Sequence, residues 1–258
     1  MTPMLLAIDT STNYASLALA DGEQLVVELT WHAGSRHSTE LFARLTQLLQ
    51  TYALEPERDL AAVAVATGPG SFNGLRVALA TAKSLAFALG VPLYGVPTLD
   101  IIAWGAAFVR GTVWALLDAG RGQLYAAAYD APAAAAATWA PRDGYAILTP
   151  DELAARVTQP VLCCGEWRDV THAVLERALG ERARWATTLP KGRAAGLAQL
   201  AQARAAAGRV DQPATLEPLY LRRPAITSSA KVAHLASGDA TRAPASSSGE
   251  GATRAVHD

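Results

Sequence analysis

The sequence contains few cysteines: Cys163 and Cys164 are the only two among 258 residues. Adjacent cysteines rarely bond to each other, and they lack the spacing of metal ligands. A fold held together by disulfides is therefore not expected, and this usage is typical of the reducing cytosol. We expect both cysteines to lie in a short buried strand, 161–164, as small hydrophobic side chains.

The sequence also lacks net charge, since 22 lysines and arginines face 23 aspartates and glutamates. Proteins that bind nucleic acid unaided usually carry a pronounced basic patch, so near-neutrality argues against that class. Arg222 and Arg223 would reach RNA phosphates, but two adjacent arginines at the end of a strand are usually solvated. We therefore predict no direct contact with nucleic acid.

Long apolar runs are missing as well. Asp9 interrupts the first apolar run after five residues, so we expect no signal peptide. No segment approaches the length of a membrane span, and we expect a soluble, cytoplasmic protein with no membrane contact. Because 51% of the residues are hydrophobic, the chain can still bury a sizeable core, as one large domain or two smaller ones.

The most informative motif is rich in glycine and lies between an apolar run, 61–66, and a predicted helix, Leu75–Leu89. Its residues are Gly68-Pro69-Gly70-Ser71-Phe72-Asn73-Gly74-Leu75-Arg76. Such a turn lets backbone N–H groups approach an anion, and the helix N-terminus adds a favourable dipole. The motif is not a P-loop, because no Gly-Lys-Ser/Thr follows it. Its glycines would equally serve tight turning and close helix packing, which is the interpretation we favour.

The first hundred residues predict a meander of three strands followed by alternating strands and helices. The expected strands are 4–8, 14–20, 25–31, 61–66 and 91–96, and the expected helices are 37–52, 75–89 and one that opens at residue 97. Asp21-Gly22 is a strong hairpin signal within the meander. This order predicts a mixed sheet with helices on its faces.

A second unit begins at Gly111 and repeats the opening order of strand, aspartate, turn and strand. Its expected elements are 113–118, 123–129, 151–157, 161–164, 170–179, 194–207 and 216–221. From residue 225 the sequence is rich in Ser, Ala, Gly and Thr and has few apolar residues to bury. We therefore predict a first lobe over 1–110, a second lobe over 111–224 and a disordered tail over 225–258.

Two such halves resemble the actin-like ATPase (ASKHA) fold of sugar kinases and Hsp70, an α/β fold of two similar lobes, each a mixed β-sheet flanked by helices. Five motifs resemble more specifically the bacterial TsaB family, also called YeaZ, within the TsaD/Gcp-like superfamily. They run in order from residue 4 to about 223: Leu6–Thr12, His37-Ser38, Gly68–Arg76, Leu117–Tyr125 and Glu217–Arg222. The family usually has Thr where this chain has Asn73, and Asn caps a helix equally well.

The resemblance implies a non-catalytic scaffold or activating subunit for the synthesis of threonylcarbamoyladenosine (t6A) in tRNA. In that machinery TsaC makes threonylcarbamoyl-AMP, and the larger homologue TsaD transfers the group to the adenosine next to the anticodon. The implied partners are TsaD and the ATPase TsaE, with tRNA reached only through the complex. Formation of a homodimer and binding of ADP or ATP at the interface with the partner are left open, and no other cofactor is implied.

Histidines are too sparse for a metal-dependent transferase resembling TsaD. Such an enzyme needs two histidines one helical turn apart, because residues i and i+4 share one face of a helix. Leu41 occupies that position relative to His37. The remaining histidines stand apart: His32, His172, His234 and His257. We predict no metal site, and we expect each histidine to serve at the surface or as a cap.

Asp9 and Asp118 each follow the first strand of one half. In kinases of the actin-like fold such an aspartate lies near the metal–nucleotide complex. The alternative, which we favour for Asp9, is that it only caps the turn through 10–13; Asp118 has the same two interpretations. A weak nucleotide site, shared with the partner, would use Asp9, Thr10, Ser11, Gly68, Gly70, Ser71, Asn73, Gly74 and Asp118.

The helix Leu75–Leu89 carries a core stripe, but small residues leave its other sides nearly bare, which allows another helix to approach closely. Phe87 lies near Ala80 and Lys83, and an apolar patch on a second face is typical of a partner surface. We hypothesise that this helix and His37–Tyr52 pair with the same helices of TsaD or of a second copy. In the alternative, both faces are covered within the monomer. The predicted contact residues are His37, Leu41, Leu45, Leu48, Arg76, Ala80, Lys83 and Phe87.

Two enzymatic functions remain as alternatives. An ATP-dependent phosphotransferase or hydrolase of the same fold would use Asp9, the glycine-rich loop and Asp118. A metallopeptidase is suggested only by a distant similarity of TsaD-like proteins to enzymes of that description. The missing histidine pair argues against the metallopeptidase.

Overall fold

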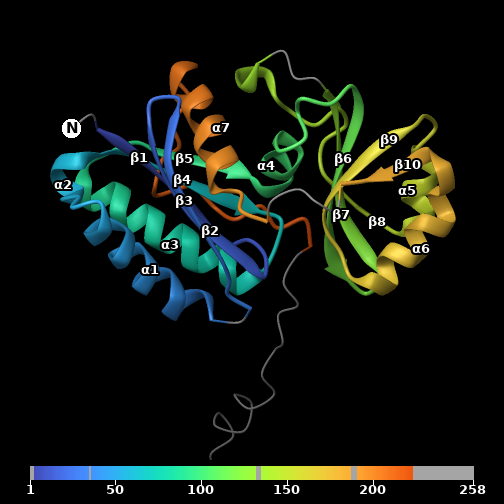
Figure 1. Cartoon of the computed structure of the whole chain (residues 1–258), viewed down its shortest axis with the longest axis horizontal. Coiled ribbons are helices and arrows are strands. Elements are labelled where there is room, and N and C mark those ends of the chain that lie inside the picture. Colours follow the sequence, from blue (N-terminus) through green and yellow to red (C-terminus); the bar gives the residue numbers. More distant parts are fainter. Residues whose placement is uncertain (1–2, 35, 132–134, 187–190, 223–258) are drawn as a thin grey trace, which may run out of the picture. The chain divides into compact units, whose positions relative to one another are not determined.

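The structure is a computed structural model that describes residues 3–34, 36–131, 135–186 and 191–222 (Figure 1). All of these residues belong to one compact unit, Met1–Arg223. The predicted disordered tail over 225–258 lies outside the described residues, as does part of the alanine-rich tract near residue 133.

A five-stranded mixed sheet forms the first half of the unit. Its order is β3 (Gln24–His32), β2 (Tyr14–Asp21), β1 (Met4–Asp9), β4 (Leu60–Gly68) and β5 (Leu93–Pro97). The meander β1–β2–β3 is antiparallel, whereas β1, β4 and β5 run parallel. The predicted strands and the predicted mixed sheet are confirmed.

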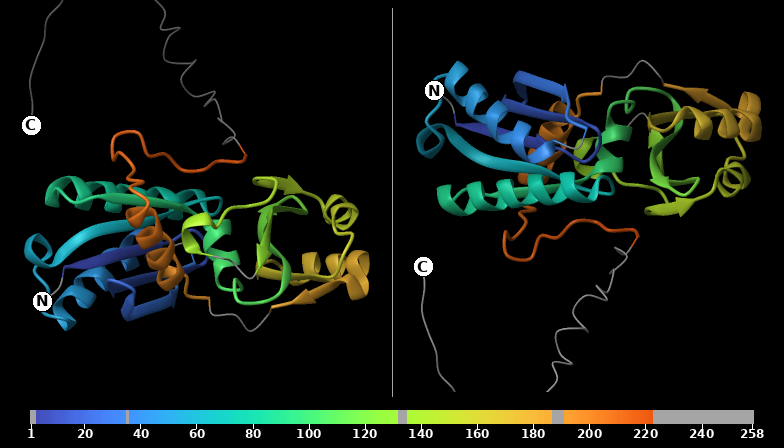
Figure 2. Two further views of the ribbon diagram at one scale, coloured as in Figure 1. Left: turned by 90° about the horizontal axis from the view of Figure 1, so that it is seen from above. Right: turned by 90° about the horizontal axis from the view of Figure 1, so that it is seen from below.

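Alternate residues of β1 face opposite sides of this sheet, because side chains in a strand alternate. Leu6 and Ile8 pack with α1 (His37–Thr51) and α3 (Phe72–Leu89) on one side. Ala7 packs with α7 (Ala194–Ala206) on the other side. Figure 1 shows α1 and α3 below the sheet and α7 above it. In Figure 2, α7 lies in front of the sheet in the view from above, and α1 and α3 lie in front of it in the view from below. A short α2 (Pro56–Asp59) leads into β4.

A second five-stranded mixed sheet forms the other half. Its order is β8 (Ala146–Leu148), β7 (Gln123–Ala131), β6 (Gly111–Gly120), β9 (Val161–Glu166) and β10 (Ala183–Trp185). Counted from its first strand, this order and its pattern of antiparallel and parallel pairs equal those of the first sheet. The predicted α/β class, with two similar mixed-sheet lobes flanked by helices, is confirmed.

Helices cover both faces of the second sheet. The buried residues of α5 (Pro150–Arg156) and α6 (Asp169–Leu179) pack on the face that holds Cys163. The residues of α4 (Thr98–Trp104) pack on the opposite face with Cys164. Both cysteines are buried, and burial raises the pKa of the Cys163 thiol to about 12. The prediction that they serve as small hydrophobic residues in a buried strand is confirmed.

Two helices depart from the predicted division into residues 1–110 and 111–224. Helix α4 precedes residue 111 yet covers the second sheet, while α7 follows it yet covers the first sheet. The indole of Trp104, at the end of α4, donates a hydrogen bond to Gln199 of α7 at 2.7 Å. Each half of the chain therefore supplies one covering helix to the sheet of the other half.

Three local features differ from the sequence-based expectations. Strands β8 and β10 were not predicted, because three residues carry too little pattern. The segment 216–221 forms no strand but runs between the halves, where the Leu219 N–H donates to Thr67 and Arg222 donates to the Ala119 carbonyl.

Among the helices of the described residues, none combines the length and the apolar character needed to cross a bilayer.

Candidate functional site

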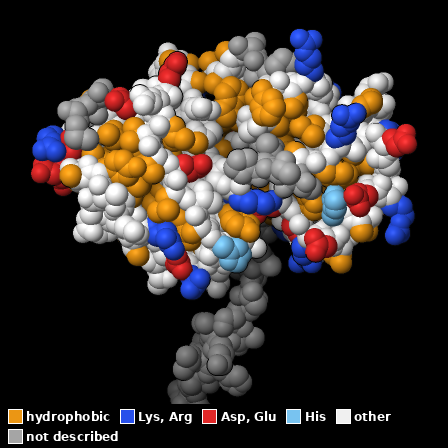
Figure 3. All heavy atoms as spheres, in the orientation of Figure 1, with side chains coloured by type: hydrophobic (Ala, Val, Ile, Leu, Met, Phe, Trp, Pro, Cys, Tyr) orange, Lys and Arg blue, Asp and Glu red, His pale blue; other side chains and the backbone are white. Residues whose placement is uncertain are grey.

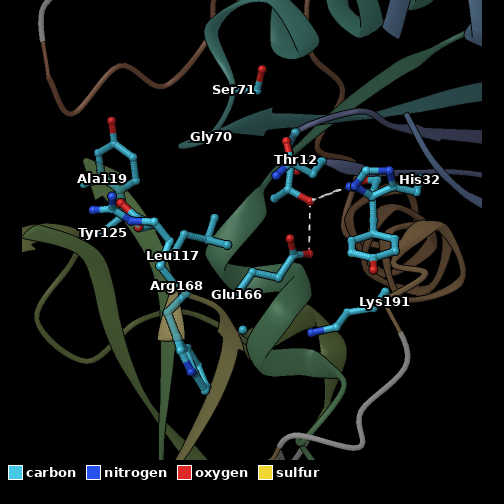
Figure 4. Close-up of a pocket in the computed structure, with 16 residues that line it drawn as sticks. Thr12, His32, Gly70, Ser71, Leu117, Ala119, Tyr125, Glu166, Arg168 and Lys191 are labelled. Atoms are coloured by element: carbon cyan, nitrogen blue, oxygen red, sulfur yellow. Dashed lines mark hydrogen bonds and ion pairs between the residues drawn. The ribbon is translucent and has the colours of Figure 1, made fainter. Parts of the chain in front are cut away.

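A cleft of about 600 Å³ opens between the ends of the strands of the two halves (Figure 4). The first half contributes the β1–β2 turn, the end of β3 and the glycine-rich loop. The second half contributes the ends of β6 and β9. The lining residues that matter for the argument are Ser11, Thr12, Ser71, Asp118, Glu166 and Lys191. The volume falls in the range of small-molecule sites, roughly 300–1,000 Å³.

The glycine-rich loop packs directly on the β1–β2 turn. A Cβ atom at Gly70 would lie 2.1 Å from the Ser11 carbonyl oxygen, and one at Gly74 would lie 2.0 Å from the Thr10 carbonyl oxygen. Real Cβ atoms do not approach oxygen so closely, so only glycine fits at either position. The Ser71 N–H donates to the Ser11 carbonyl at 2.7 Å, and the Thr10 hydroxyl donates to the Gly74 carbonyl at 2.6 Å. These contacts support the interpretation that the glycines serve packing.

Helix α3 begins three residues before the predicted start, at Phe72. Ser71 is its N-cap, because its hydroxyl accepts from the Gly74 N–H at 3.3 Å. Asn73 lies inside the first turn with an exposed side chain, so the expectation that Asn73 caps the helix was wrong. The physical reason is that Gly74 belongs to the helix and needs the cap ahead of it.

Asp9 is fully buried at the end of β1 and has two partners. Its Oδ1 accepts from the Ser11 N–H at 2.8 Å, which is the predicted cap of the turn. Its Oδ2 accepts from the Arg193 Nε at 2.7 Å. Arg193 immediately precedes α7 and is itself buried. Burial alone would lower the pKa of Arg193, but the nearby carboxylates of Asp9 and Glu166 raise it, so this side chain stays charged.

Glu166 brings the second half to the same place. Its carboxylate, at the end of β9, pairs with Arg193 and accepts from the Thr12 hydroxyl at 3.0 Å. Figure 4 shows Glu166 pointing across the cleft at Thr12, with Lys191 nearby. Next to the cleft, whose lining includes Thr12 and Glu166, lies an ion-paired cluster in which one arginine joins carboxylates from both sheets.

Asp118 lies at the matching position of the second half, but at the rim. Its Oδ1 accepts from the Gly120 N–H at 2.6 Å, and its Oδ2 pairs with Arg168. This pair is far more exposed than that of Asp9. Both aspartates thus cap the turn that follows them, as the capping interpretation predicted.

The predicted nucleotide residues divide into two groups. Ser11, Gly70, Ser71 and Asp118 line the cleft, and the Ser11 hydroxyl is buried without a hydrogen-bond partner among the described residues. The others do not line it: Asp9, Thr10, Gly68, Asn73 and Gly74. Asp9 and Thr10 are used by the contacts above, and the Gly68 N–H donates to the Thr98 hydroxyl at 3.1 Å. The structure therefore brings together only part of the predicted set.

The predicted partner residues also fall into two groups, one buried and one at or near the surface. The four from α1 are buried in the core of the first half, where no partner would touch their side chains: His37, Leu41, Leu45 and Leu48. Burial lowers the pKa of His37, which keeps this histidine neutral. The residues from α3 lie at or near the surface: Arg76, Ala80, Lys83 and Phe87. Phe42 of α1, which the sequence argument left out, is 57% exposed.

Arg193 and Glu166 are the site residues that sequence reasoning missed. Arg193 and Asp9 are 184 positions apart, and no local spacing relates them. Glu166 lies two residues beyond the predicted strand 161–164, where nothing in the sequence distinguishes it from the other carboxylates. Within the described part of the chain, no three His, Cys, Asp or Glu side chains gather as they would around a metal ion. The prediction of no metal site rests on the sequence argument.

Comparisons with known proteins find similarity to proteins of tRNA threonylcarbamoyladenosine synthesis. A family model described as TsaD, tRNA N6-adenosine threonylcarbamoyltransferase, matches residues 31–154. The tRNA threonylcarbamoyladenosine biosynthesis protein TsaB of Bacillus subtilis is 28% identical over 178 residues, which are 69% of this chain and 77% of that protein. TsaB of Escherichia coli is 33% identical over 166 residues, which are 63% of this chain and 68% of that protein.

A solved structure of the YeaZ group is also similar to this chain. YeaZ from Pseudomonas aeruginosa superposes with a TM-score of 0.69 at 27% sequence identity. The match covers 85% of this chain and 100% of that one. The likeness therefore extends through both sheets rather than through the glycine-rich loop alone.

Proposed function

The chain belongs to the TsaB family, and from this premise we propose that it takes part in tRNA threonylcarbamoyladenosine synthesis as a non-catalytic scaffold subunit. The TsaB proteins of Bacillus subtilis and Escherichia coli, to which it is similar, are named for that synthesis. In the proposal it pairs with a TsaD-like larger homologue, meets a TsaE-like ATPase in the same complex, and reaches tRNA only through that complex. We place it in the cytoplasm, where tRNA is modified.

One observation carries the scaffold role: α1 and α3 lie side by side on one face of the first sheet, and each exposes a phenylalanine. Phe87 is 83% exposed and Phe42 is 57% exposed. Figure 3 shows hydrophobic side chains gathered at the left of its view, where Figure 1 places α1 and α3. Exposed apolar patches of this kind mark binding surfaces. We call Phe42, Ala80 and Phe87 the helix-pair face.

The ion-paired cluster beside the cleft supports the non-catalytic part of the proposal. The carboxylate of Asp9 would be the natural group to hold a metal–nucleotide complex, but it is paired with Arg193. A guanidinium in contact with both Asp9 and Glu166 repels a second cation at that point. In the proposal this subunit acts by binding: burying the helix-pair face favours the competent state of its partner, through a higher affinity for that state.

A binding experiment with a matched control tests the proposal. Phe87→Arg places a charge in the helix-pair face, and Val170→Arg makes the same change at an exposed apolar residue of α6, which is 67% exposed. Each variant is co-expressed with the TsaD-like homologue of the same organism. Complex formation is measured by affinity capture and light scattering, and t6A in total tRNA by mass spectrometry in cells that lack the native chain.

Phe87→Arg is expected to weaken the complex at least about 30-fold, as for a buried aromatic hot spot worth roughly 2 kcal/mol or more. It should lower t6A in parallel, whereas Val170→Arg should change neither. Loss of the complex with full t6A would refute the scaffold role. Loss in both variants would indicate a misfolded chain, which circular dichroism of each variant checks.

A nucleotide in the cleft is the second candidate, and a specific observation favours it. Ser11 lines the cleft, and its buried hydroxyl lacks a hydrogen-bond partner among the described residues; Ser71 lies beside it at the start of α3. Helix N-termini bind phosphate readily. Calorimetric titration of ADP and ATP into the chain alone and into the complex tests this. Binding only in the complex supports a shared site, and turnover by the chain alone, abolished by Asp9→Ala, would favour the enzymatic alternative.

A further inference from the structure

Four oxygen atoms converge on the guanidinium of Arg193. Two are carboxylate oxygens, one from Asp9 at the end of β1 and one from Glu166 at the end of β9. The other two are the Thr12 hydroxyl oxygen at 2.7 Å and the Tyr14 carbonyl oxygen at 3.0 Å. Carboxylate, hydroxyl and carbonyl oxygens together form the ligand set of a hard divalent cation such as Ca²⁺.

The arginine is held in place by its backbone as well as by its charge. The N–H groups of Arg193 and Ala194 both donate to the Ser16 hydroxyl, at 3.1 and 3.0 Å. The Ala195 N–H donates to the Glu28 carboxylate at 3.0 Å. These bonds satisfy the first N–H groups of α7 and fix the helix against β2 and β3. A Cβ at Gly192 would lie 2.3 Å from the Thr30 hydroxyl, so only glycine fits at position 192.

Arg193 and Asp9 meet in a site that is almost closed to water. The side chain of Arg193 is 6% exposed and that of Asp9 is not exposed at all. Two carboxylates that lie so close in a buried site repel each other strongly unless a cation lies between them. Among the described residues, Arg193 is the one cation that bridges both.

We propose that Arg193 is a tethered cation: its guanidinium occupies a cation site built from oxygens of both sheets and thereby fastens the two sheets together beside the cleft. The inference does not depend on the proposed function, because it concerns only contacts within this chain. A tethered cation makes the junction of the two halves independent of any dissolved metal ion. It also fixes the distance between β1 and β9, since both carboxylates hold the same planar group.

Thermal unfolding of Arg193→Ala with and without Ca²⁺ tests the proposal. Removing one partner of a buried ion pair is strongly destabilising, and we expect the Tm to fall by roughly 6–20 °C without added metal. The emptied site keeps its two carboxylates, so Ca²⁺ at millimolar concentration should raise the Tm of this variant by about 5 °C or more. The Tm of the natural chain should not respond to Ca²⁺.

Two controls make the Ca²⁺ response specific. Sodium chloride at matched ionic strength separates a bound ion from screening of surface charge. The double variant Arg193→Ala/Glu166→Gln lacks one carboxylate and should lose the response. If Arg193→Ala does not respond to Ca²⁺, or if the natural chain and the double variant respond equally, the proposal is overturned.

A second variant keeps the proposal testable if Arg193→Ala does not fold. Arg193→Gln retains much of the side-chain volume without the charge and goes through the same measurement. Folding of either variant only in the presence of Ca²⁺ would also support the proposal. Failure of Arg193→Gln to respond to Ca²⁺ would overturn it.

Discussion

Asp9 and Asp118 occupy matching places in two sheets of one topology, and their surroundings differ sharply. Asp9 is the last residue of β1 and Asp118 lies near the end of β6, the first strand of its half, and each accepts a hydrogen bond from the N–H two residues later. The side chain of Asp9 is 0% exposed and its partner Arg193 is 6% exposed. The side chain of Asp118 is 23% exposed and its partner Arg168 is 58% exposed.

The cause of the difference lies in what covers each aspartate. The segment that leads into α7 covers the end of β1 and delivers Arg193 from a distant part of the sequence. Arg168, in contrast, lies just beyond β9 and reaches Asp118 along the rim of the cleft. The same local motif of strand, aspartate and turn thus becomes a buried ion pair in one half and a surface pair in the other.

Of the substitutions that test this comparison, replacing Asp9 should have the largest effect on the free energy of unfolding. Asp9→Asn removes the charge and leaves Arg193 with Glu166 alone. We expect the free energy of unfolding to fall by about 3–5 kcal/mol, the usual cost of breaking a buried pair. Urea denaturation followed by tryptophan fluorescence measures it. A loss below about 1 kcal/mol would mean that the two aspartates are energetically equivalent.

The second-largest effect on stability is expected in the glycine-rich motif of the first half. Gly74→Ala puts a methyl group where the Thr10 carbonyl lies, and the backbone of the β1–β2 turn must move. Overpacking of this kind costs about 1–3 kcal/mol. Gly105→Ala is the matched control, because its nearest neighbour would be 3.4 Å away, and we expect little change. Equal stability of both variants, measured by the urea midpoint, would contradict the packing role.

A third aspartate, Asp100 on α4, can be compared with Asp9 and Asp118. It accepts hydrogen bonds from the hydroxyls of Tyr129 and Tyr145, at 2.7 and 2.8 Å. Burial raises the pKa of Asp100 above its ordinary value of 3.8, although both tyrosine hydrogen bonds act to lower it. The folded state therefore holds the Asp100 proton more tightly than the unfolded state does.

The sign of the pH dependence follows. The contribution of Asp100 to stability is fully present below pH 3.8 and is lost as the pH rises through the raised pKa of the folded state. Asp100→Asn cannot ionise, so its stability relative to the natural chain should increase with pH over this window. Urea midpoints of both proteins between about pH 4 and 7 measure it. A constant difference would contradict the raised pKa.

Replacing Asp118 should have the smallest effect. An exposed ion pair contributes about 0–1 kcal/mol, and water replaces the lost partner readily. Asp118→Asn should therefore lower the free energy of unfolding by less than about 1 kcal/mol, and the same urea titration used for Asp9 measures it. A larger loss would show that Arg168 matters for the second half as Arg193 does for the first.

Local patterns predicted much of the fold. The apolar run 61–66, the hairpin signal at Asp21-Gly22 and the periodicity of α1 each depend on residues close in sequence, where propensity and alternation are informative. The repeated order of strand, aspartate, turn and strand predicted two similar sheets. The start of α3 was misplaced because Ser71 and Asn73 are equally good caps, and only packing against Thr10 decides between them.

Such local patterns could not predict the ion-paired cluster beside the cleft. Nothing near Arg193 marks it as the partner of Asp9, and the alanines of α7 do not reveal which sheet this helix covers. The stripe Leu41, Leu45 and Leu48 was predicted to contact a partner, but its spacing is equally that of a core stripe. Helical periodicity identifies an apolar face without saying what covers it.

The exchange of helices between the two sheets has a consequence for synthesis on the ribosome. The alanine-rich face of the first sheet is completed by α7, the last helix of the described residues. Until residue 206 has left the exit tunnel, that face of the sheet remains open to water or to chaperones. The N-terminal half therefore cannot finish folding during translation before the C-terminal half has been made.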